Sequence, residues 1–274
     1  MTALRARDLS FSWGNREVFS EISLELPRGE VTAILGANGS GKTTLLGCLA
    51  GLLAPRRGVV EALGIHANGV QAIHAMSARE RARTVALVPQ LSEVSFGYRA
   101  VDLVTMGVSA GTSAFFSPGP REEHAALAEL ERLGIAHLAS RSLARMSGGE
   151  QRLVLIARAL ATRASVLLLD EPTAHLDFRN QLVVGELLAS LAAERGIAVV
   201  FTTHLPTDAF SVASHALLLY QDGRPKFGPI HGVITDQALR DAFSVDARVV
   251  ALHMNGSQSH VVVPLKPLNG KEQS

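Results

Sequence analysis

The sequence is poor in cysteine, in aromatic residues and in long apolar runs. A single cysteine, Cys48, among 274 residues excludes a disulfide framework and a cysteine-based zinc site, and we expect it to be a small packed side chain. The longest uncharged runs, at residues 103–120 and 249–265, are interrupted by glycine, proline or polar residues, so neither is predicted to span a membrane. Residues 1–8 carry charges and no apolar stretch, so we expect no signal peptide and a soluble chain.

The sequence also has no excess of positively or negatively charged residues. The 26 Lys and Arg residues are matched by 25 Asp and Glu residues, which gives a formal net charge of +1. This balance argues against a broad basic surface, and hence against nucleic acid as a partner. We expect the small basic cluster at residues 79–83 to be a solvated helix face. His253 and His260 have no acidic or cysteine neighbour in the sequence, so we expect no metal site there.

Short apolar runs predict the fold. They lack alternation of polar and apolar residues, which is typical of strands buried on both faces. They lie at residues 31–35, 85–88, 166–169 and 197–201. The helical patterns between and around them lie at residues 42–53, 121–133, 150–161 and 181–195. Together they predict an α/β fold with a parallel sheet covered by helices. Residues 4–26 favour short antiparallel strands, and we expect the chain beyond Pro264 to be loose.

The segment 36–43, Gly-Ala-Asn-Gly-Ser-Gly-Lys-Thr, matches the phosphate-loop pattern G-x-x-x-x-G-K-[ST]. It lies between a predicted buried strand and a predicted helix, as that pattern requires. Its glycines let backbone N–H groups turn toward phosphate oxygens, and the N-terminus of the following helix favours negative charge. Lys42 can reach the β- and γ-phosphates, and the Thr43 hydroxyl can ligate Mg²⁺. An ordinary glycine-rich turn is the weaker alternative.

Polar residues follow the other predicted strands. Asp170 can hold Mg²⁺ through water, and Glu171 can orient or deprotonate an attacking water. Gln90 and His204 also follow predicted strands, at the edge where ligands bind in open α/β sheets. The segment 147–149, Ser-Gly-Gly, begins a helical pattern and can face an anion. Each of these features taken alone has a structural alternative: a strand end, a satisfied polar side chain or a common turn.

In their order, these motifs resemble those of an ATP-binding-cassette (ABC) ATPase over about residues 2–235. The matching segments are 36–43 for the Walker A motif, 166–171 for Walker B, 146–150 for the LSGGQ signature, 176–177 for the D-loop, Gln90 for the Q-loop and His204 for the switch histidine. The departures are mild, since none removes a catalytic group. They are Ala37, Thr43-Thr44, Met146 and Glu150, in place of residues common in the family.

The resemblance implies that two copies pair head to tail, with ATP between the Walker A motif of one copy and the signature of the other. The ATP-binding residues it implies are Trp13, Gly36, Asn38, Gly39, Ser40, Gly41, Lys42, Thr43, Thr44, Ser147, Gly148, Gly149 and Asp177. The catalytic residues it implies are Glu171, His204 and Gln90, and the Mg²⁺ ligands are Thr43, Gln90 and Asp170. Trp13 stands where the family places a ring that stacks on adenine. Phe11 is its competitor, and a core aromatic is the alternative.

Several segments also resemble the importer ATPases for iron-siderophores, haem and cobalamin. They are residues 85–90, 171–177, 202–206 and the ending 228–243. Leu205 in place of Asp, and the absence of Gly after Phe243, depart from that subgroup. The resemblance implies an ATPase at the cytoplasmic face of the inner membrane that powers import through a separate permease, with a substrate-binding protein as an indirect partner. An export cassette is the alternative, and a soluble ABC protein without a permease is a more distant one.

For the domains, the resemblance implies a P-loop NTPase ABC cassette over residues 2–238. It has a parallel-sheet core, an N-terminal antiparallel β subdomain and a helical subdomain inserted at residues 91–146. Residues 239–274 form a C-terminal extension. We expect the apolar content that buried strands do not explain to serve docking, and a groove beside Gln90 and the insertion to receive a helix of the permease.

Overall fold

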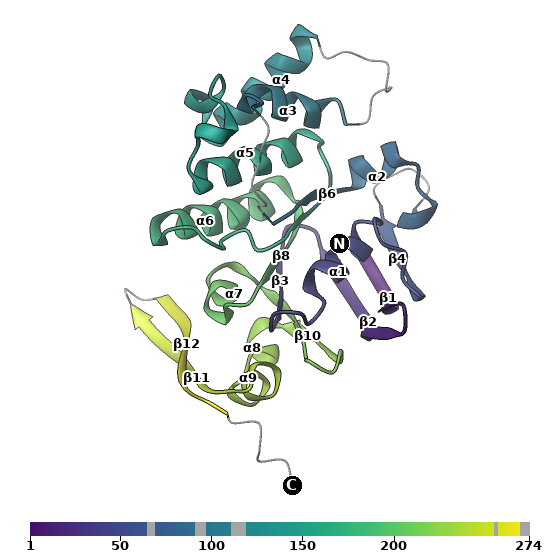
Figure 1. Ribbon diagram of the computed structural model, residues 1–274, viewed down its shortest axis with the longest axis vertical. Helices are drawn as coiled ribbons and strands as arrows, with labels where there is room; N and C mark the ends of the chain where they lie inside the picture. The colour runs from purple at the N-terminus through teal and green to yellow at the C-terminus, as the bar shows by residue number, and fades with distance from the viewer. Residues whose placement is uncertain (65–68, 91–96, 111–118, 255–256, 269–274) are drawn as a thin grey trace.

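A six-stranded sheet forms the centre of the protein in a computed structural model, which describes residues 1–64, 69–90, 97–110, 119–254 and 257–268 (Figure 1). Its strand order is β10-β9-β3-β8-β7-β6, and all strands run parallel except β10 at one edge. The bounds are β3 Val31–Gly36, β6 Val85–Val88, β7 Val166–Leu169, β8 Ala198–Thr203, β9 His215–Leu219 and β10 Pro225–Pro229. The predicted parallel-sheet core is therefore confirmed.

Both faces of this sheet are buried. Every residue of β3, β7 and β8 is buried. Successive side chains enter different cores, since Ala33 and Leu35 pack on one face of β3 and Ile34 on the other. A strand whose two faces are both covered has no polar face, which is why its residues show no alternation in the sequence.

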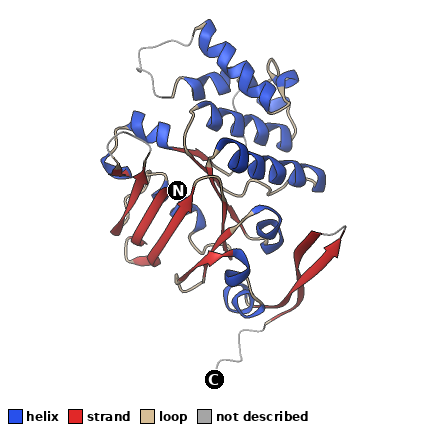
Figure 2. Cartoon of the chain, turned by 180° about the vertical axis from the view of Figure 1, so that it is seen from behind, coloured by secondary structure: helices blue, strands red, loops and turns tan. Residues whose placement is uncertain are grey.

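Helices cover one face of the sheet, and a second sheet with one helix covers the other (Figure 2). The covering helices are α5 Gly148–Ala161, α6 Phe178–Arg195 and α7 Pro206–Val212. The opposite face packs against α1 Lys42–Leu49, and the buried Cys48 belongs to this contact. Burial raises the pKa of the Cys48 thiol to about 12, so the side chain acts as a small apolar group, as expected.

The helix α1 ends four residues earlier than the pattern at residues 42–53 predicts. Gly51 adopts a left-handed conformation, with φ +69°. The N–H groups of Leu52 and Leu53 then donate back to the carbonyl of Gly47 and close the helix end. The apolar residues after Leu49 therefore belong to a turn.

The second sheet is antiparallel, with strand order β2-β1-β4-β5. Its first two strands are β1 Thr2–Trp13 and β2 Arg16–Pro27, which confirms the antiparallel strands predicted at residues 4–26. The sequence did not indicate the other two, β4 Arg57–Leu63 and β5 Val70–Ala72. A short 3₁₀ turn, η1 Ile73–Ala75, and the helix α2 Ala78–Thr84 lead from this sheet to β6.

A helical layer lies beyond α5 at one end of the molecule (Figure 1). It contains α3 Ala100–Val108 and α4 Pro120–Arg132, with the 3₁₀ turns η2 Ala136–Leu138 and η3 Leu143–Arg145. Its apolar core packs α3 and α4 against α5. The helical insertion is expected at residues 91–146. Of these, residues 91–96 and 111–118 lie outside the part of the chain that the structure describes. No described helix is both long and apolar enough to cross a membrane.

The chain ends in two short helices and a hairpin that lies against α7 and the second of these helices at one side of the molecule (Figure 1). The helices are α8 Ile230–Val233 and α9 Asp236–Phe243, and the hairpin strands are β11 Val245–Met254 and β12 Ser257–Pro267. The expectation of a loose chain beyond Pro264 is wrong up to Pro267, because those residues pair with β11. The boundary predicted at residue 238 lies within α9, and the division into cassette and extension stays a prediction.

Replacing Gly107 by alanine should destabilise the fold. A Cβ at Gly107 of α3 would lie 2.2 Å from the carbonyl oxygen of Arg158 in α5, so the two helices must separate. We expect Gly107→Ala to lower the free energy of unfolding by about 1–3 kcal/mol, as overpacking does. The matched control is Gly232→Ala in α8, which has no atom within 4 Å of the new Cβ. Urea titrations followed by circular dichroism measure the difference, and equal midpoints for both variants would contradict this packing.

Candidate active site

A cavity of about 810 Å³ opens at the carboxyl ends of the parallel strands. Its walls come from the end of β1 and the start of β2, the loop before α1 and the first turn of α1, and the segments after β6, β7, β8 and β9. The expected site residues that line it are Trp13, Asn38, Gly39, Ser40, Gly41, Lys42, Thr43, Thr44, Gln90, Glu171 and His204. Gly36 and Asp170 lie against this group, since they accept hydrogen bonds from Lys42 and Thr43.

The loop between β3 and α1 packs closely and leaves polar groups unpaired. A Cβ on Gly36 would lie 2.4 Å from Ser40 Oγ and 2.8 Å from the carbonyl oxygen of Leu219, so the loop has room only for glycine there. Gly41, at the N-terminus of α1, has φ +99° and supplies no side-chain cap. The buried Ser40 hydroxyl has no hydrogen-bond partner among the described residues. A buried hydroxyl beside an uncapped helix N-terminus fits a phosphate group.

Lys42 places its ammonium group inside this loop. The side chain is 6% exposed, and Nζ donates to the carbonyl oxygens of Gly36 at 2.9 Å and Ala37 at 3.2 Å. Burial lowers the pKa of Lys42, and the carboxylates of Glu171 and Asp170 oppose that shift. The positive charge is therefore held in a poorly solvated place where it attracts anions strongly.

Two threonine hydroxyls hold the carboxylate of Asp170. Thr43 Oγ1 donates to Asp170 Oδ2 at 2.7 Å, and Thr202 Oγ1 donates to Asp170 Oδ1 at 2.6 Å. The carboxylate therefore lies between α1 and β8 at the end of β7. Carboxylate and hydroxyl oxygens are the ligands that Mg²⁺ prefers, so this pair fits a magnesium ion.

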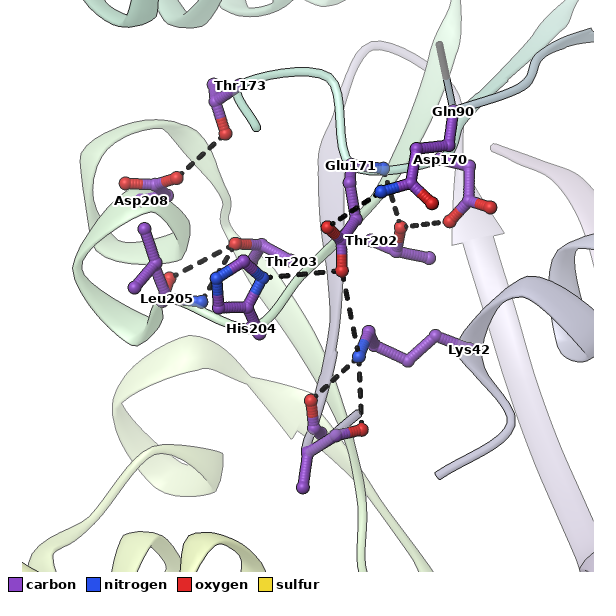
Figure 3. Close-up of polar contacts among 12 residues, drawn as sticks. Lys42, Gln90, Asp170, Glu171, Thr173, Thr202, Thr203, His204, Leu205 and Asp208 are labelled. Atoms are coloured by element: carbon purple, nitrogen blue, oxygen red, sulfur yellow. Dashed lines mark hydrogen bonds and ion pairs between the residues drawn. The ribbon is translucent and has the colours of Figure 1, made fainter. Parts of the chain in front are cut away.

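Glu171 lies at the centre of the site (Figure 3). Its Oε1 is 3.9 Å from Lys42 Nζ and 3.3 Å from His204 Nδ1, and its Oε2 accepts from Gln90 Nε2 at 3.4 Å. Its backbone has φ +44°, a left-handed conformation that non-glycine residues seldom adopt. The structure thus brings together the side chains that the sequence placed after four different strands.

The two aromatic candidates differ in exposure. Trp13 is 58% exposed and lines the cavity, whereas Phe11 is 6% exposed and belongs to the core. The Phe11 ring meets the Trp13 ring edge-on, at a centroid distance of 5.0 Å. The alternative that Trp13 is a core aromatic is therefore wrong, and Trp13 has a ring face free for a ligand.

The remaining expected residues form a second group that does not line the cavity. Ser147 begins α5 in a capping box, in which its hydroxyl accepts from the N–H of Glu150 at 3.3 Å. Asp177 begins α6 by accepting from the N–H of Asn180 at 2.8 Å. A Cβ on Gly149 would lie 2.9 Å from the Asn180 side chain, so the two helix starts touch. Gly148 stands between Ser147 and Gly149 in this group.

Sequence reasoning missed several residues of the site. Those that line the cavity are Arg16, Glu17, Val18, His175 and Gln221. Arg16 pairs with Trp13 across the β1–β2 turn, and the glycine in that turn was the signal that could have placed it. Thr202 and Arg152 are two others, because they contact Asp170 and Glu171 over separations that no local pattern reveals.

Comparison with known proteins agrees with this geometry. The family model described as ABC transporter matches residues 19–174. The molybdate import ATP-binding protein MolC of Haemophilus influenzae is 34% identical over 242 residues, which cover 88% of each chain. The hemin import ATP-binding protein HmuV of Bordetella pertussis is 36% identical over 262 residues, covering 90% of this chain and 94% of that one.

A solved structure extends the likeness to the fold. It is described as an inward-facing conformation of a metal-chelate type ABC transporter, and one of its chains superposes with a TM-score of 0.85 at 33% identity. The match covers 97% of this chain and 98% of the other. The resemblance that the motifs indicate is thereby confirmed over nearly the whole length. This protein belongs to the ABC transporter family, as an ATP-binding subunit of such a transporter.

Proposed function

We propose that this protein binds ATP in the 810 Å³ cavity and hydrolyses it to power uptake of a metal chelate through a separate membrane permease. The observation that supports this most directly is the convergence of Lys42, Asp170 and Glu171 at one edge of the sheet. The buried ammonium of Lys42 attracts the phosphates. The carboxylate of Asp170 and the hydroxyl beside it fit a metal ion, and the carboxylate of Glu171 faces the cavity. Few reactions other than phosphoryl transfer need these three groups in this order.

The phosphates of ATP bind the backbone N–H groups of residues 36–43, the Ser40 hydroxyl and the Lys42 ammonium. The ammonium donates to two neutral carbonyls of the same loop. Phosphate oxygens are charged acceptors and make stronger hydrogen bonds, so they displace those carbonyls. Trp13 stacks on the adenine ring through its exposed face, and its neighbour Phe11 supports it from the core.

Glu171 acts as the general base of hydrolysis. Its carboxylate accepts a proton from water as the water oxygen bonds to the γ-phosphorus, and the bond from that phosphorus to the bridging oxygen of ADP breaks. Gln90 and His204 orient the carboxylate from two sides, and His204 steadies the γ-phosphate end. Thr43, Asp170 and Gln90 would hold Mg²⁺, which would neutralise phosphate charge when bound.

A second copy of the chain completes the site. Ser147, Gly148, Gly149 and Asp177 lie away from the phosphate loop of their own chain, so they are available to the nucleotide of a partner. The start of α5 presents a helix N-terminus suited to the γ-phosphate. ATP held between two copies would close the dimer, and hydrolysis would open it.

The relatives support import, and the hemin and iron(3+)-hydroxamate proteins among them support a metal-chelate cargo. The relatives named above are import proteins for molybdate and hemin, and a further one, from Bacillus subtilis, is an iron(3+)-hydroxamate import protein. The solved structure is of the metal-chelate type. We therefore propose that the protein acts at the cytoplasmic face of the membrane, beside a permease fed by a substrate-binding protein. Uptake assays with a ferric siderophore, haem, cobalamin and molybdate would distinguish the cargoes.

A basic cavity and an adjoining apolar groove offer a docking surface for the permease. The cavity, of about 770 Å³, is lined by Arg28, Arg83, Arg132, Arg163 and Arg195 and by one acid, Glu129. The buried Glu129 already pairs with Arg132 and Arg195, both at 2.7 Å. The apolar groove runs along β6, α3 and α5 next to Gln90, and both depressions share Ala110 and Thr162. We expect a permease segment with an apolar face and acidic residues to bind there.

Replacing Glu171 by glutamine should abolish hydrolysis and leave ATP binding intact. Glutamine keeps the shape of the side chain and cannot accept the proton, so we expect phosphate release to fall at least about 100-fold. With ATP bound and not consumed, the variant should elute as a dimer in size-exclusion chromatography. Hydrolysis at the wild-type rate would remove the role assigned to Glu171.

Replacing Trp13 by alanine should weaken ATP binding. Stacking of a base on an aromatic side chain contributes about 1–3 kcal/mol, so we expect the Kd for ATP to rise about 5- to 150-fold. Trp13→Phe, which keeps a ring, should restore most of the affinity. Isothermal titration calorimetry with the Glu171→Gln variant as background measures binding without turnover, and unchanged affinity in Trp13→Ala would move the adenine contact elsewhere.

Reversing the charge of Arg83 should weaken the complex with the permease. Arg83→Glu places a negative charge in the cavity that we expect to receive acidic residues, so less permease should co-purify in detergent. Arg79→Glu on the same helix is the matched control, because Arg79 is also exposed and does not line the cavity. Basal hydrolysis by the isolated chain should be unchanged in both. Equal yields of complex for the two variants would contradict this surface.

A further inference from the structure

Thr202 is a wholly buried polar side chain near the carboxyl end of β8. Its exposed fraction is 0%, and every neighbour in β8 is buried too. Its hydroxyl donates to Asp170 Oδ1 at 2.6 Å and accepts from the N–H of Glu171 at 2.8 Å. One buried oxygen therefore joins the expected metal-binding carboxylate to the backbone of the expected general base (Figure 3).

The backbone of Glu171 is held from its other side by Arg152. This side chain of α5 is 1% exposed, and its Nη2 donates to the carbonyl oxygen of Glu171 at 3.3 Å. Its Nη1 donates to the carbonyl oxygen of Pro89, directly before Gln90, at 3.0 Å. The N–H and the C=O of Glu171 thus each bond to a buried side chain from a different element of the fold, and the C=O also accepts from the N–H of Ala174 at 3.2 Å.

These two contacts matter because Glu171 has a left-handed backbone, with φ +44°. A non-glycine residue leaves that conformation unless its surroundings hold it there. If the backbone relaxed, the Cα–Cβ bond would turn, and the carboxylate would leave its place between Lys42, Gln90 and His204. The position of the carboxylate therefore depends on the partners of its backbone.

We propose that Thr202 and Arg152 are positioning residues, which hold Glu171 in the strained backbone conformation that aims its carboxylate at the attacking water. This inference rests on the proposed function of Glu171 as general base. Neither residue lines the cavity, so neither should affect ATP binding directly. Their loss should lower kcat and leave KM for ATP unchanged.

Thr202→Val tests the proposal, because valine has nearly the shape of threonine and lacks the hydroxyl. We expect kcat for ATP hydrolysis to fall about 10- to 100-fold, as misplacement of a catalytic group does, with KM and the Kd for ATP within about twofold of wild type. Thr202→Ser keeps the hydroxyl and should restore kcat. Thr202→Cys has a weak hydrogen-bonding group of similar size, so its kcat should lie between those of the valine and serine variants. It replaces Thr202→Val in the test if the valine variant does not fold.

The matched control is Thr84→Val, which removes another hydroxyl that is 0% exposed and bonds to the carbonyl of Glu80, far from Glu171 in the fold. We expect its kcat to equal that of wild type. Wild-type kcat in Thr202→Val, an equal loss in Thr202→Ser, or an equal loss in Thr84→Val would each overturn the positioning role. Buried hydroxyls would then act on stability alone.

A double variant separates this proposal from the role of Glu171 itself. Because Thr202 acts through Glu171, Thr202→Val should cause no further fall in kcat when Glu171→Gln is already present. A further fall would overturn the proposal, since Thr202 would then act by another route. Full hydrolysis in Glu171→Gln alone would instead show that the proposed general base is wrong.

Discussion

Burial of the parallel sheet on both faces is the constraint on which the rest of this structure depends. Strands such as β3 and β7 have no face that meets water, so polar side chains can leave the core only at the strand ends. In parallel strands the carboxyl ends all meet at one edge. Lys42, Gln90, Glu171 and His204 therefore gather at that edge although they follow four different strands in the sequence. The site is a consequence of how the sheet is covered.

The same constraint explains why so much of the core could be predicted. A strand without a polar face appears in the sequence as an unbroken apolar run, and the runs at 85–88 and 166–169 coincide with β6 and β7. Gln90, Asp170 and Glu171 then follow a run by one or two positions, and His204 follows its run by three, so their place at the sheet edge also follows. The phosphate loop adds a second local signal, because its glycines are required by close contacts such as those of Gly36 with the Ser40 side chain and the carbonyl of Leu219.

Other parts depend on contacts between distant segments and could not be predicted. The strands β4 and β5 are only partly buried, and β4 pairs with β1 while β5 pairs with β4. The hairpin β11–β12 combines its own ladder with contacts to α7 and α9. Thr202 could not be distinguished from its neighbour Thr203 in β8, because its role arises from Asp170 and Glu171, which lie 32 and 31 residues away in the sequence. Arg152 pairs with the carbonyl of Pro89, 63 residues away. A pattern of neighbours carries no information about such pairs.

Arg152 also bears on how two sites in a dimer could respond to each other. It lies one turn into α5, the helix that begins at Ser147, and its guanidinium bonds to the carbonyls of Pro89 and Glu171. Moving α5 relative to β6 and β7 would leave buried polar groups unpaired, at about 1–3 kcal/mol for each group. In the proposed pairing, the start of α5 faces the ATP of the second copy, whereas Glu171 faces the ATP of its own chain. If α5 shifts when its start binds the ATP of the second copy, Arg152 would transmit that shift to Glu171, the general base at the chain's own ATP. The two sites would then be coupled without any contact between the two nucleotides.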